Sequence, residues 1–279
     1  MNELTGKVAA VTGAASGLGR AMALAFASEG MHVALADVDE AGLSATRSEV
    51  TRLNVRSLAM RVDVSKSAEV DAFAERTAAE LGAVHVVCNN AGVALSGAVW
   101  EHSEAEWQWI LGVNLWGVVH GVRAFAPRLI AQNDGHIVNT ASVAGLISPP
   151  GMGAYCVSKH AVVALSESLH HDLRERGCAV GVSVLCPAYV ATGIAESERN
   201  KPRDLSLTKS KERVAKEAML RKAIAAGKLS PDDVAQAVVG AVKQNRFYVL
   251  THPAIKAAIR ARMEDVLEER TPRDPLALR

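Results

Sequence analysis

A glycine-rich turn near the start of the chain constrains the fold more than any other feature. Residues 7–11 predict a buried strand, residues 20–29 predict a helix, and between them the sequence reads TGAASGLG. Residues without side chains let backbone amides and the positive end of a helix approach a phosphate closely. Such a turn also arises merely to join a strand to a helix, and its spacing is GxxxGxG, not GxGxxG. The candidate phosphate-binding residues are Gly13, Ser16, Gly17, Leu18 and Gly19.

Short apolar runs alternate with helical segments along most of the chain. Residues 68–81 and 158–176 have helical spacing, and Gly30, Gly82 and Gly177 lie where a helix would hand over to a strand. The runs are almost continuously apolar, as expected when helices cover both faces of a sheet. The predicted fold is therefore α/β, a Rossmann-like doubly wound parallel sheet of about seven strands with helices on both faces. Further predicted strands are residues 32–36, 84–87, 136–138, 180–185 and 247–250.

Composition argues against several classes of function. The chain has 31 basic and 30 acidic residues, and its net charge of +1 gives no strong positive potential that would attract nucleic acid or an anionic membrane. No window holds the ~18 to 20 uninterrupted apolar residues of a membrane span, and the first residues do not form a signal peptide. We therefore expect a cytoplasmic protein without nucleic-acid or membrane partners. No metal-ligand spacing is found, and the cysteines expected to be reduced packing residues are Cys88, Cys156, Cys178 and Cys186.

The chain is predicted to form one domain over residues 1–279. The alternation of predicted strands and helices ends after Pro187. The polar, charged residues 193–228 predict a mobile lid that becomes ordered over a bound ligand. In the tail, residues 253–279, apolar side chains recur at helical spacing and must be covered by this domain or by another subunit. We expect a homo-oligomer, a dimer or tetramer. The apolar tail residues are Ile255, Ile259, Met263, Val266 and Leu267.

Asp37 ends the second predicted strand, 18 residues after Gly19. A carboxylate at this place can accept hydrogen bonds from the adenosine ribose hydroxyls of NAD, and it would repel the 2′-phosphate of NADP. The alternative is an ordinary cap of the helix that begins at Glu40, a role for which Asp39 competes. Arg20, the basic residue beside the glycine turn, is expected to point away. The predicted cofactor is NAD.

Tyr155 and Lys159 lie four residues apart at the start of a predicted helix, and hence on one face of it. A tyrosine with a pKa of about 10 is a poor base at neutral pH, and a nearby fixed positive charge favours its phenolate. Ser142 follows a strand thirteen residues before Tyr155, at the carboxyl end of the sheet, where ligands bind in such folds. The three side chains predict a proton-transfer site in which the serine hydroxyl holds a substrate oxygen.

Over roughly residues 4–250 these motifs resemble the short-chain dehydrogenase/reductase family, in its compact single-domain branch. Residues 12–19 match the pattern TGxxxGxG, residues 89–92 read NNAG, and residues 155–159 match YxxxK. Asn114 matches the family's helical asparagine, and Ser142 its serine. The resemblance implies that Tyr155 is the general acid/base and that Ser142 orients the carbonyl. It also implies that Lys159 holds the nicotinamide ribose and tunes Tyr155, while Asn114 anchors a water relay to Lys159.

The resemblance also implies the remainder of the cofactor site. Asp63 and Val64 belong to the adenine pocket, and Val190 and Thr192 to the nicotinamide carboxamide. The family's usual Pro-Gly is Pro187-Ala188 in this chain, which leaves the backbone less freedom than glycine would. The implied cofactor residues beyond the glycine turn are Asp37, Asp63, Val64, Asn90, Ala91, Gly92, Tyr155, Lys159, Pro187, Val190 and Thr192.

The residues expected around the substrate are mostly apolar. The resemblance implies NAD-dependent hydride transfer between nicotinamide and a secondary alcohol or its ketone, and these residues favour an apolar or aryl substrate. One alternative is a ketoreductase for an anionic or acyl-thioester substrate, because residues 196–222 hold nine basic and five acidic residues. Another is a non-catalytic cofactor-sensing protein, which would have no need of an acid/base pair. The candidate substrate-binding residues are Leu95, Ala144, Ile147, Met152 and Tyr189.

Overall fold

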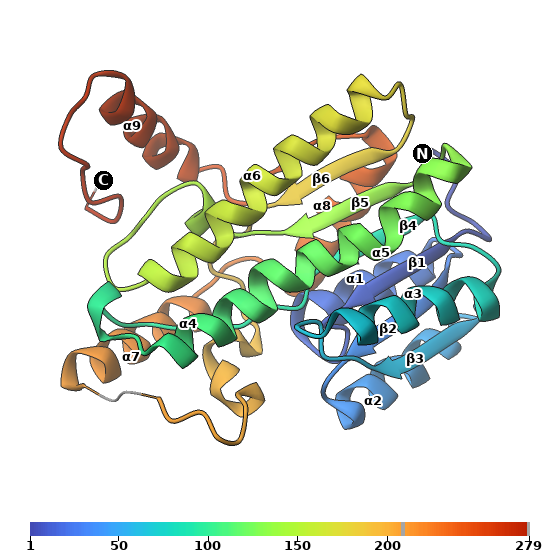
Figure 1. The fold of residues 1–279 in the computed structure, drawn as a ribbon, viewed down its shortest axis with the longest axis horizontal. Helices are drawn as coiled ribbons and strands as arrows, with labels where there is room; N and C mark the ends of the chain where they lie inside the picture. Colours follow the sequence, from blue (N-terminus) through green and yellow to red (C-terminus); the bar gives the residue numbers. More distant parts are fainter. Residues whose placement is uncertain (208–209, 278–279) are drawn as a thin grey trace.

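A parallel sheet forms the centre of the computed structural model, which describes residues 1–207 and 210–277 (Figure 1). Its seven strands follow the order β3-β2-β1-β4-β5-β6-β7, and all neighbours are parallel. This arrangement confirms the predicted α/β doubly wound fold. The strands are β1 Val8–Thr12, β2 His32–Asp37, β3 Ser57–Arg61, β4 Val86–Asn89, β5 His136–Thr140, β6 Gly181–Leu185 and β7 Tyr248–Val249.

Helices cover both faces of the sheet. Those on one face are α1, α2 and α8, and those on the other are α3, α5 and α6 (Figure 1). Short 3₁₀ turns at Val99–Glu101, Val143–Gly145 and Gly193–Asn200 and a π-turn at Gly112–Trp116 lie between longer elements. The helices are α1 Gly17–Ser28, α2 Glu40–Thr51, α3 Ser67–Leu81, α4 Glu104–Leu111, α5 Gly117–Gln132, α6 Gly153–Glu175, α7 Lys211–Ala225, α8 Pro231–Gln244 and α9 Ile255–Leu267.

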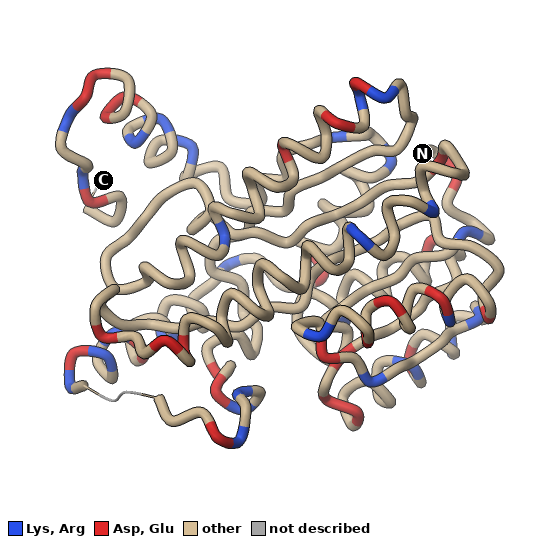
Figure 2. The backbone as a smooth tube through the Cα atoms, viewed as in Figure 1, with Lys and Arg blue, Asp and Glu red and all other residues tan. Residues whose placement is uncertain are grey.

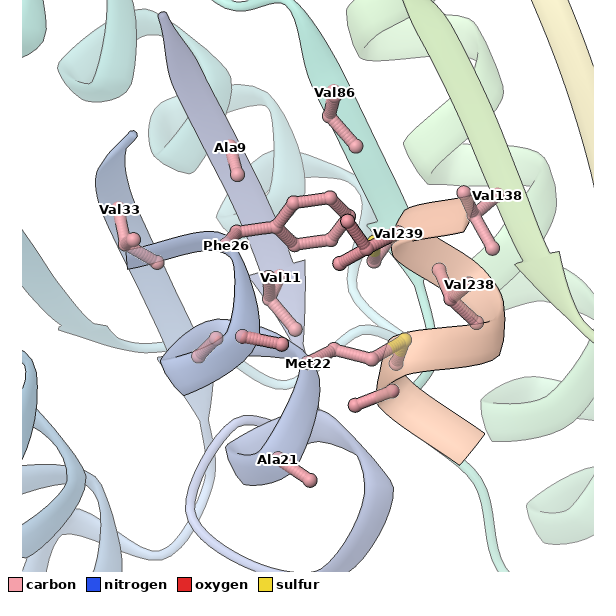
Figure 3. Close-up of a cluster of buried hydrophobic side chains, with 14 of the residues drawn as sticks. Ala9, Val11, Ala21, Met22, Phe26, Val33, Val86, Val138, Val238 and Val239 are labelled. Carbon is pink, nitrogen blue, oxygen red and sulfur yellow. The ribbon is translucent and has the colours of Figure 1, made fainter. Parts of the chain in front are cut away.

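The apolar strands supply two hydrophobic cores, one on each face of the sheet. Alternate side chains of a strand point to opposite faces. Accordingly, Ala9 and Val11 of β1 pack under Phe26 of α1, which lies beside Val239 of α8 (Figure 3). Val8 and Ala10 belong to the core on the other face. The sandwiched position of the sheet explains why the predicted strands are continuously apolar.

The observed elements differ from the predicted ones mainly at their ends. The helix expected over residues 158–176 begins at Gly153, so Tyr155 already lies in its first turn. The strand expected over residues 84–87 is shifted to Val86–Asn89. Strand β3 was not predicted, because it is an edge strand whose apolar run is only three residues long, between Ser57 and Arg61. The three glycines expected at helix ends all have left-handed backbones, with φ of 78° at Gly30, 92° at Gly82 and 68° at Gly177.

Charged side chains lie around the sheet and not in its centre. Strands β1, β4, β5 and β6 carry no Lys, Arg, Asp or Glu, whereas both signs are mixed along the outer helices and loops (Figure 2). The four cysteines are free and buried, as expected of packing residues. Among the helices of the described ranges, none is long and apolar enough to cross a bilayer.

The polar segment 193–228 is more structured than its composition suggests. It contains α7, and residues 208–209 within it lie outside the described residues. Arg213 of α7 is fully buried, and its guanidinium lies 2.5 Å from the carboxylate of Glu106 in α4, also fully buried. This buried ion pair ties α7 to α4, because it lets a charged side chain pack inside the protein. The ordering of this segment over a ligand stays a prediction.

The tail that follows β7 forms helix α9, and its last two residues, 278–279, lie outside the described residues. Helix α9 projects from the body of the molecule (Figure 1). The apolar side chains of Met263, Val266 and Leu267 are exposed on it. The predicted apolar stripe is therefore left uncovered by the described part of this chain at these three positions.

We predict that Arg213→Met detaches α7 from the body. The Glu106 carboxylate would stay buried without its partner, and removing one member of a buried ion pair costs roughly 3–5 kcal/mol. Hydrogen exchange should become at least about tenfold faster in α7 while the sheet keeps its protection. The control is Arg221→Met, which removes an exposed helix α7 arginine that lies 3.8 Å from Glu196. Equal exchange in α7 of the two variants would contradict the assignment.

Candidate active site

One cavity of about 840 Å³ crosses the carboxyl ends of the strands. It begins at Asp37 after β2, passes the glycine turn after β1, and reaches Ser142 and Tyr155 beyond β5. Strand β1 lies between β2 and β4 in the sheet, so the chain reverses its strand order at this point. Ligands of open α/β sheets bind in the crevice formed at such a reversal. Of the predicted cofactor and catalytic residues, all but Gly19 and Asn114 line this one cavity.

The glycine turn is shaped by close approaches that a side chain would prevent. The backbone of Gly13 is left-handed, with φ of 68°, and a Cβ there would lie 2.8 Å from the Ala91 Cα. A Cβ on Gly19 would lie 2.0 Å from the carbonyl oxygen of Gly13. Gly19 thus packs behind the turn, while Ser16, Gly17 and Leu18 line the cavity at the start of α1. This backbone cradle fits a diphosphate, which needs free amides and no side chains in the way.

Both carboxylate oxygens of Asp37 accept backbone hydrogen bonds, one from the glycine turn and one from the loop that follows β2. They accept hydrogen bonds from the backbone amides of Ala15, at 2.9 Å, and of Asp39, at 3.0 Å. The cap of α2 is Asp39, whose side chain accepts from the amide of Gly42. The capping role therefore belongs to Asp39, and binding of the ribose by Asp37 stays a prediction. Arg20 is turned away, as expected, and pairs with Glu49 at 2.5 Å.

The cavity extends past Asp37 to the end of β3. Asp63 and Val64 line it there, as predicted for an adenine pocket. The Asp63 carboxylate accepts hydrogen bonds from the amide and the hydroxyl of Ser65, at 3.0 and 2.7 Å. The Val64 carbonyl is 2.9 Å from the His120 ring. Both residues are thus fixed in place at the rim farthest from Tyr155.

A chain of hydrogen bonds joins the glycine turn to Lys159. The Thr12 hydroxyl accepts from the amides of Asn90, at 2.9 Å, and Ala91, at 3.1 Å. The Asn90 side chain in turn accepts from the Thr140 hydroxyl at 3.2 Å. The Thr140 carbonyl accepts from the Lys159 ammonium at 3.0 Å. The ends of β1, β4 and β5 are therefore held at fixed spacing, with Asn90, Ala91 and Gly92 on the cavity wall.

Asn114 lies in the π-turn between α4 and α5 and is fully buried. Its side chain bonds both backbone groups of Val93, accepting from the amide at 2.8 Å and donating to the carbonyl at 2.9 Å. It also donates to the Ser158 hydroxyl at 3.0 Å. A Cβ added to Gly92 would lie 3.4 Å from the Asn114 side-chain oxygen and 3.5 Å from the Lys159 nitrogen. The Asn114 and Lys159 side chains therefore both lie close to Gly92. A water relay between them stays a prediction.

Ser142, Tyr155 and Lys159 meet at the inner wall of the cavity. The Lys159 nitrogen is 5.7 Å from the centre of the Tyr155 ring. Burial raises the pKa of Tyr155 to about 12, and a hydrogen bond with the Ser142 side chain acts in the opposite direction. Burial also lowers the pKa of Lys159 to about 8. Loss of solvent therefore outweighs the effect expected from the nearby positive charge in the chain without ligand.

The turn after β6 forms the wall opposite Tyr155. The Pro187 carbonyl accepts from the Ser142 hydroxyl at 3.4 Å and from the Val143 amide at 2.9 Å. Pro187, Val190 and Thr192 all line the cavity, as predicted. Ala188 does not have a left-handed backbone. Replacement of the family's glycine by alanine therefore introduces no strain at this turn.

Four of the five predicted substrate residues line the cavity near Tyr155, namely Ala144, Ile147, Met152 and Tyr189. Leu95 does not. It is buried in an apolar cluster with Trp109, Ile110 and Ala154 behind the wall, because the backbone after Gly92 turns its side chain into this cluster.

Sequence reasoning missed one wall of the cavity, which comes from α4. Trp109 is buried and lines the cavity. Ala105, Gln108 and Gly112 lie beside it. These positions have the spacing i, i+3, i+4 and i+7 of one helix face, a signal that could have identified them together. Other cavity residues that were not predicted are Leu205, Leu220, Ile224, Ile255 and Leu276.

Within residues 1–207 and 210–277, no three His, Cys, Asp or Glu side chains are grouped so that they could hold a metal ion. The arrangement offers instead a backbone cradle for phosphate, a carboxylate beside it, and a buried phenol, hydroxyl and ammonium at the other end. Such a set can bind a dinucleotide and transfer a proton to or from a substrate oxygen.

Comparison with known proteins agrees with this arrangement. Residues 7–203 match the family model described as short chain dehydrogenase. The CLA biosynthesis dehydrogenase/reductase of Lactiplantibacillus plantarum is 32% identical over 278 residues, 98% of this chain and 97% of that protein. The 1-deoxy-11-beta-hydroxypentalenate dehydrogenase of Streptomyces exfoliatus is 34% identical over 263 residues, 93% of this chain and 88% of that protein.

A solved structure is also similar over the full length. The short chain dehydrogenase/reductase from Burkholderia phymatum in complex with NAD has a TM-score of 0.97 and 49% identity, and the match covers 100% of both chains. The family model covers well over half of the present chain, and relatives match it almost from end to end. The chain therefore belongs to the short-chain dehydrogenase family and is an oxidoreductase of that family.

Proposed function

We propose that the protein transfers a hydride between NAD and an apolar secondary alcohol or its ketone. The observation that carries the proposal is the single cavity, which holds Asp37 at one end and Ser142, Tyr155 and Lys159 at the other. The names of the relatives, dehydrogenases or reductases, support the reaction class. The acid/base set favours turnover over a purely cofactor-sensing role, for which no titrating phenol would be needed.

Each of the inner residues has a distinct role in this proposal. Bound NAD would accept or return the hydride. The Tyr155 phenol exchanges the proton of the substrate oxygen, and the Ser142 hydroxyl donates a hydrogen bond that fixes this oxygen. Lys159 keeps its positive charge at neutral pH, because its lowered pKa of about 8 is still above 7. That charge favours the phenolate that alcohol oxidation requires, and so offsets part of the desolvation of Tyr155.

The cofactor site favours NAD over NADP in this proposal. Asp37 lines the cavity beside the glycine turn, and its carboxylate would repel a 2′-phosphate. Arg20, beside the glycine turn, is engaged by Glu49, and Arg61, which lines the cavity at the end of β3, lies 3.5 Å from Glu69. The NAD complex of the Burkholderia relative supports this choice.

The substrate end of the cavity favours an apolar group. Ala144, Ile147 and Met152 offer burial and dispersion contacts without charge. Two lid cations on the cavity already bond to carbonyls of the lid, Arg199 to Gly193 at 2.6 Å and Lys201 to Leu205. They are therefore less available to an anionic or acyl-thioester substrate.

The organisation of the protein is also part of the proposal. We infer one domain over residues 1–279 with residues 193–228 as a lid over the substrate. The exposed Trp116, Val266 and Leu267 support assembly into a homo-oligomer, a dimer or tetramer, because large apolar side chains favour burial between subunits.

We predict that 1-phenylethanol is oxidised with NAD more efficiently than a short hydroxy acid or a hydroxyacyl thioester. The apolar wall gains binding energy from the phenyl group and none from a carboxylate. The measurement is kcat/KM for each compound at matched concentration, followed by nicotinamide absorbance. If the anionic compounds are better by about tenfold or more, equivalent to about 1.4 kcal/mol, the lid charge governs recognition and the apolar proposal fails.

We predict that Tyr155→Phe lowers kcat by at least about 10²-fold, the scale of general acid–base catalysis, while the Kd for NAD stays near the wild-type value. The control is Tyr248→Phe, which removes a hydroxyl hydrogen-bonded to Glu167 at the edge strand, outside the cavity. Steady-state kinetics and cofactor titration separate the two effects. Near-native kcat in Tyr155→Phe would exclude the proposed proton transfer.

We predict that Asp37→Ala narrows the preference for NAD over NADP by at least about tenfold, because the repulsive charge is removed. The readout is the ratio of kcat/KM for the two cofactors. The control is Glu40→Ala, which removes an exposed carboxylate in the first turn of α2 that does not line the cavity, and it should leave the ratio unchanged. A wild-type preference for NADP would overturn the assignment of Asp37.

A further inference from the structure

The tail after α9 folds back along its own helix and is fastened there by Arg273. The Arg273 guanidinium lies 2.8 Å from the Asp265 carboxylate and donates to the Ala261 carbonyl at 2.7 Å. The Arg273 amide donates to the other Asp265 oxygen at 3.1 Å. Asp265 is 4% exposed, so the tail covers it. Hydrogen bonds from Arg273 hold the pKa of Asp265 below its usual range, and the contact therefore stays charged at neutral pH.

This fastening places a leucine from the last residues of the chain at the substrate end of the cavity. Leu276 lines the cavity, together with Ile255 from the first turn of α9. Its backbone is fixed by a turn in which Asp274 accepts from the Leu276 amide at 2.9 Å. Helix α9 and the tail after it lie on the side of the molecule opposite β3 (Figure 1). Leu276 lines the same cavity as Tyr155.

Leu276 keeps 57% of its surface exposed, although it belongs to the cavity wall. A large aliphatic side chain gains free energy when a ligand covers it. The Arg273 contacts already order the tail before a ligand binds. Binding therefore loses little further conformational entropy in the tail, and this part of the wall is preorganised. A small substrate that stays near Tyr155 would leave Leu276 uncovered, whereas a bulky apolar substrate could cover it.

We propose that residues 268–277 form a C-terminal strap that completes the substrate wall and that Leu276 selects bulky apolar substrates. This inference rests on the proposed function, because it names the part of the chain that sets the size of the substrate. Arg273 is a positioning residue in it, since it acts through the placement of Leu276 and does not line the cavity.

The test compares a bulky and a small secondary alcohol, 1-(2-naphthyl)ethanol and 2-butanol, in the full-length protein with saturating NAD. Leu276→Ala and Arg273→Gln should each raise KM for the naphthyl alcohol by about tenfold, with less than about twofold change for 2-butanol and in kcat. The matched control is Arg270→Gln, three residues from Arg273, whose side chain pairs with exposed Glu268. It should behave as wild type with both alcohols.

A second readout does not depend on turnover. Trp109 lines the same cavity, so binding of 2-acetonaphthone can be followed by quenching of tryptophan fluorescence. Leu276→Ala and Arg273→Gln should weaken this binding by about the factor found for KM. Unchanged binding and KM in both variants, with a wild type that binds and oxidises the naphthyl compounds, would overturn the strap alone. A wild type that neither binds nor oxidises them would overturn the apolar-substrate proposal and the strap with it.

Discussion

The contact between the turns that follow β1 and β4 fixes the geometry of the whole cavity. Thr12 accepts hydrogen bonds from two amides of the second turn, and Gly13 lies against Ala91 with no room for a side chain. At this point the strand order reverses, so neighbouring helices leave on opposite faces and a crevice opens between them. Every other part of the site is placed relative to this contact. On one side, the Thr140 carbonyl accepts a hydrogen bond from Lys159. On the other side, the Asp37 carboxylate accepts one from the Ala15 amide of the glycine turn.

Burial of charged and titratable groups gives the site its chemical character. Lys159 is 2% exposed and donates to a backbone carbonyl, which holds its nitrogen in place. The same burial raises the pKa of Tyr155 to about 12 and lowers that of Lys159 to about 8, so it moves the two pKa values apart. Proteins tolerate the free-energy cost of burying such groups at functional sites, because preorganised charges interact more strongly with a ligand away from water. The buried Glu106–Arg213 pair has a structural role instead, because it holds α7 beside the same cavity.

Much of the fold and of the candidate site could be predicted from residue patterns. The continuous apolar strands indicated a sheet covered on both faces, and the glycines at positions 13, 17 and 19 indicated a phosphate turn. Tyr155 and Lys159 were recognisable because their spacing is local and places them on one helix face. Leu95 was misplaced, because the direction of a side chain after Gly92 depends on a turn with no regular period. Trp109 was missed for a related reason, since an apolar helix face does not reveal whether it meets a core or a cavity.

The sequence by itself determined the local chemistry of this protein: a turn that admits phosphate, a carboxylate after the second strand, and a phenol and an ammonium one helical turn apart. Only the tertiary structure decided that Asp39 caps α2 while Asp37 accepts from the Ala15 amide of the glycine turn, because the two aspartates are alike in type and differ only in their neighbours. It also decided that Arg213 is buried and that Leu276, near the end of the chain, lines the cavity. Such placements arise from contacts between residues distant in sequence, and no local pattern of side chains encodes them.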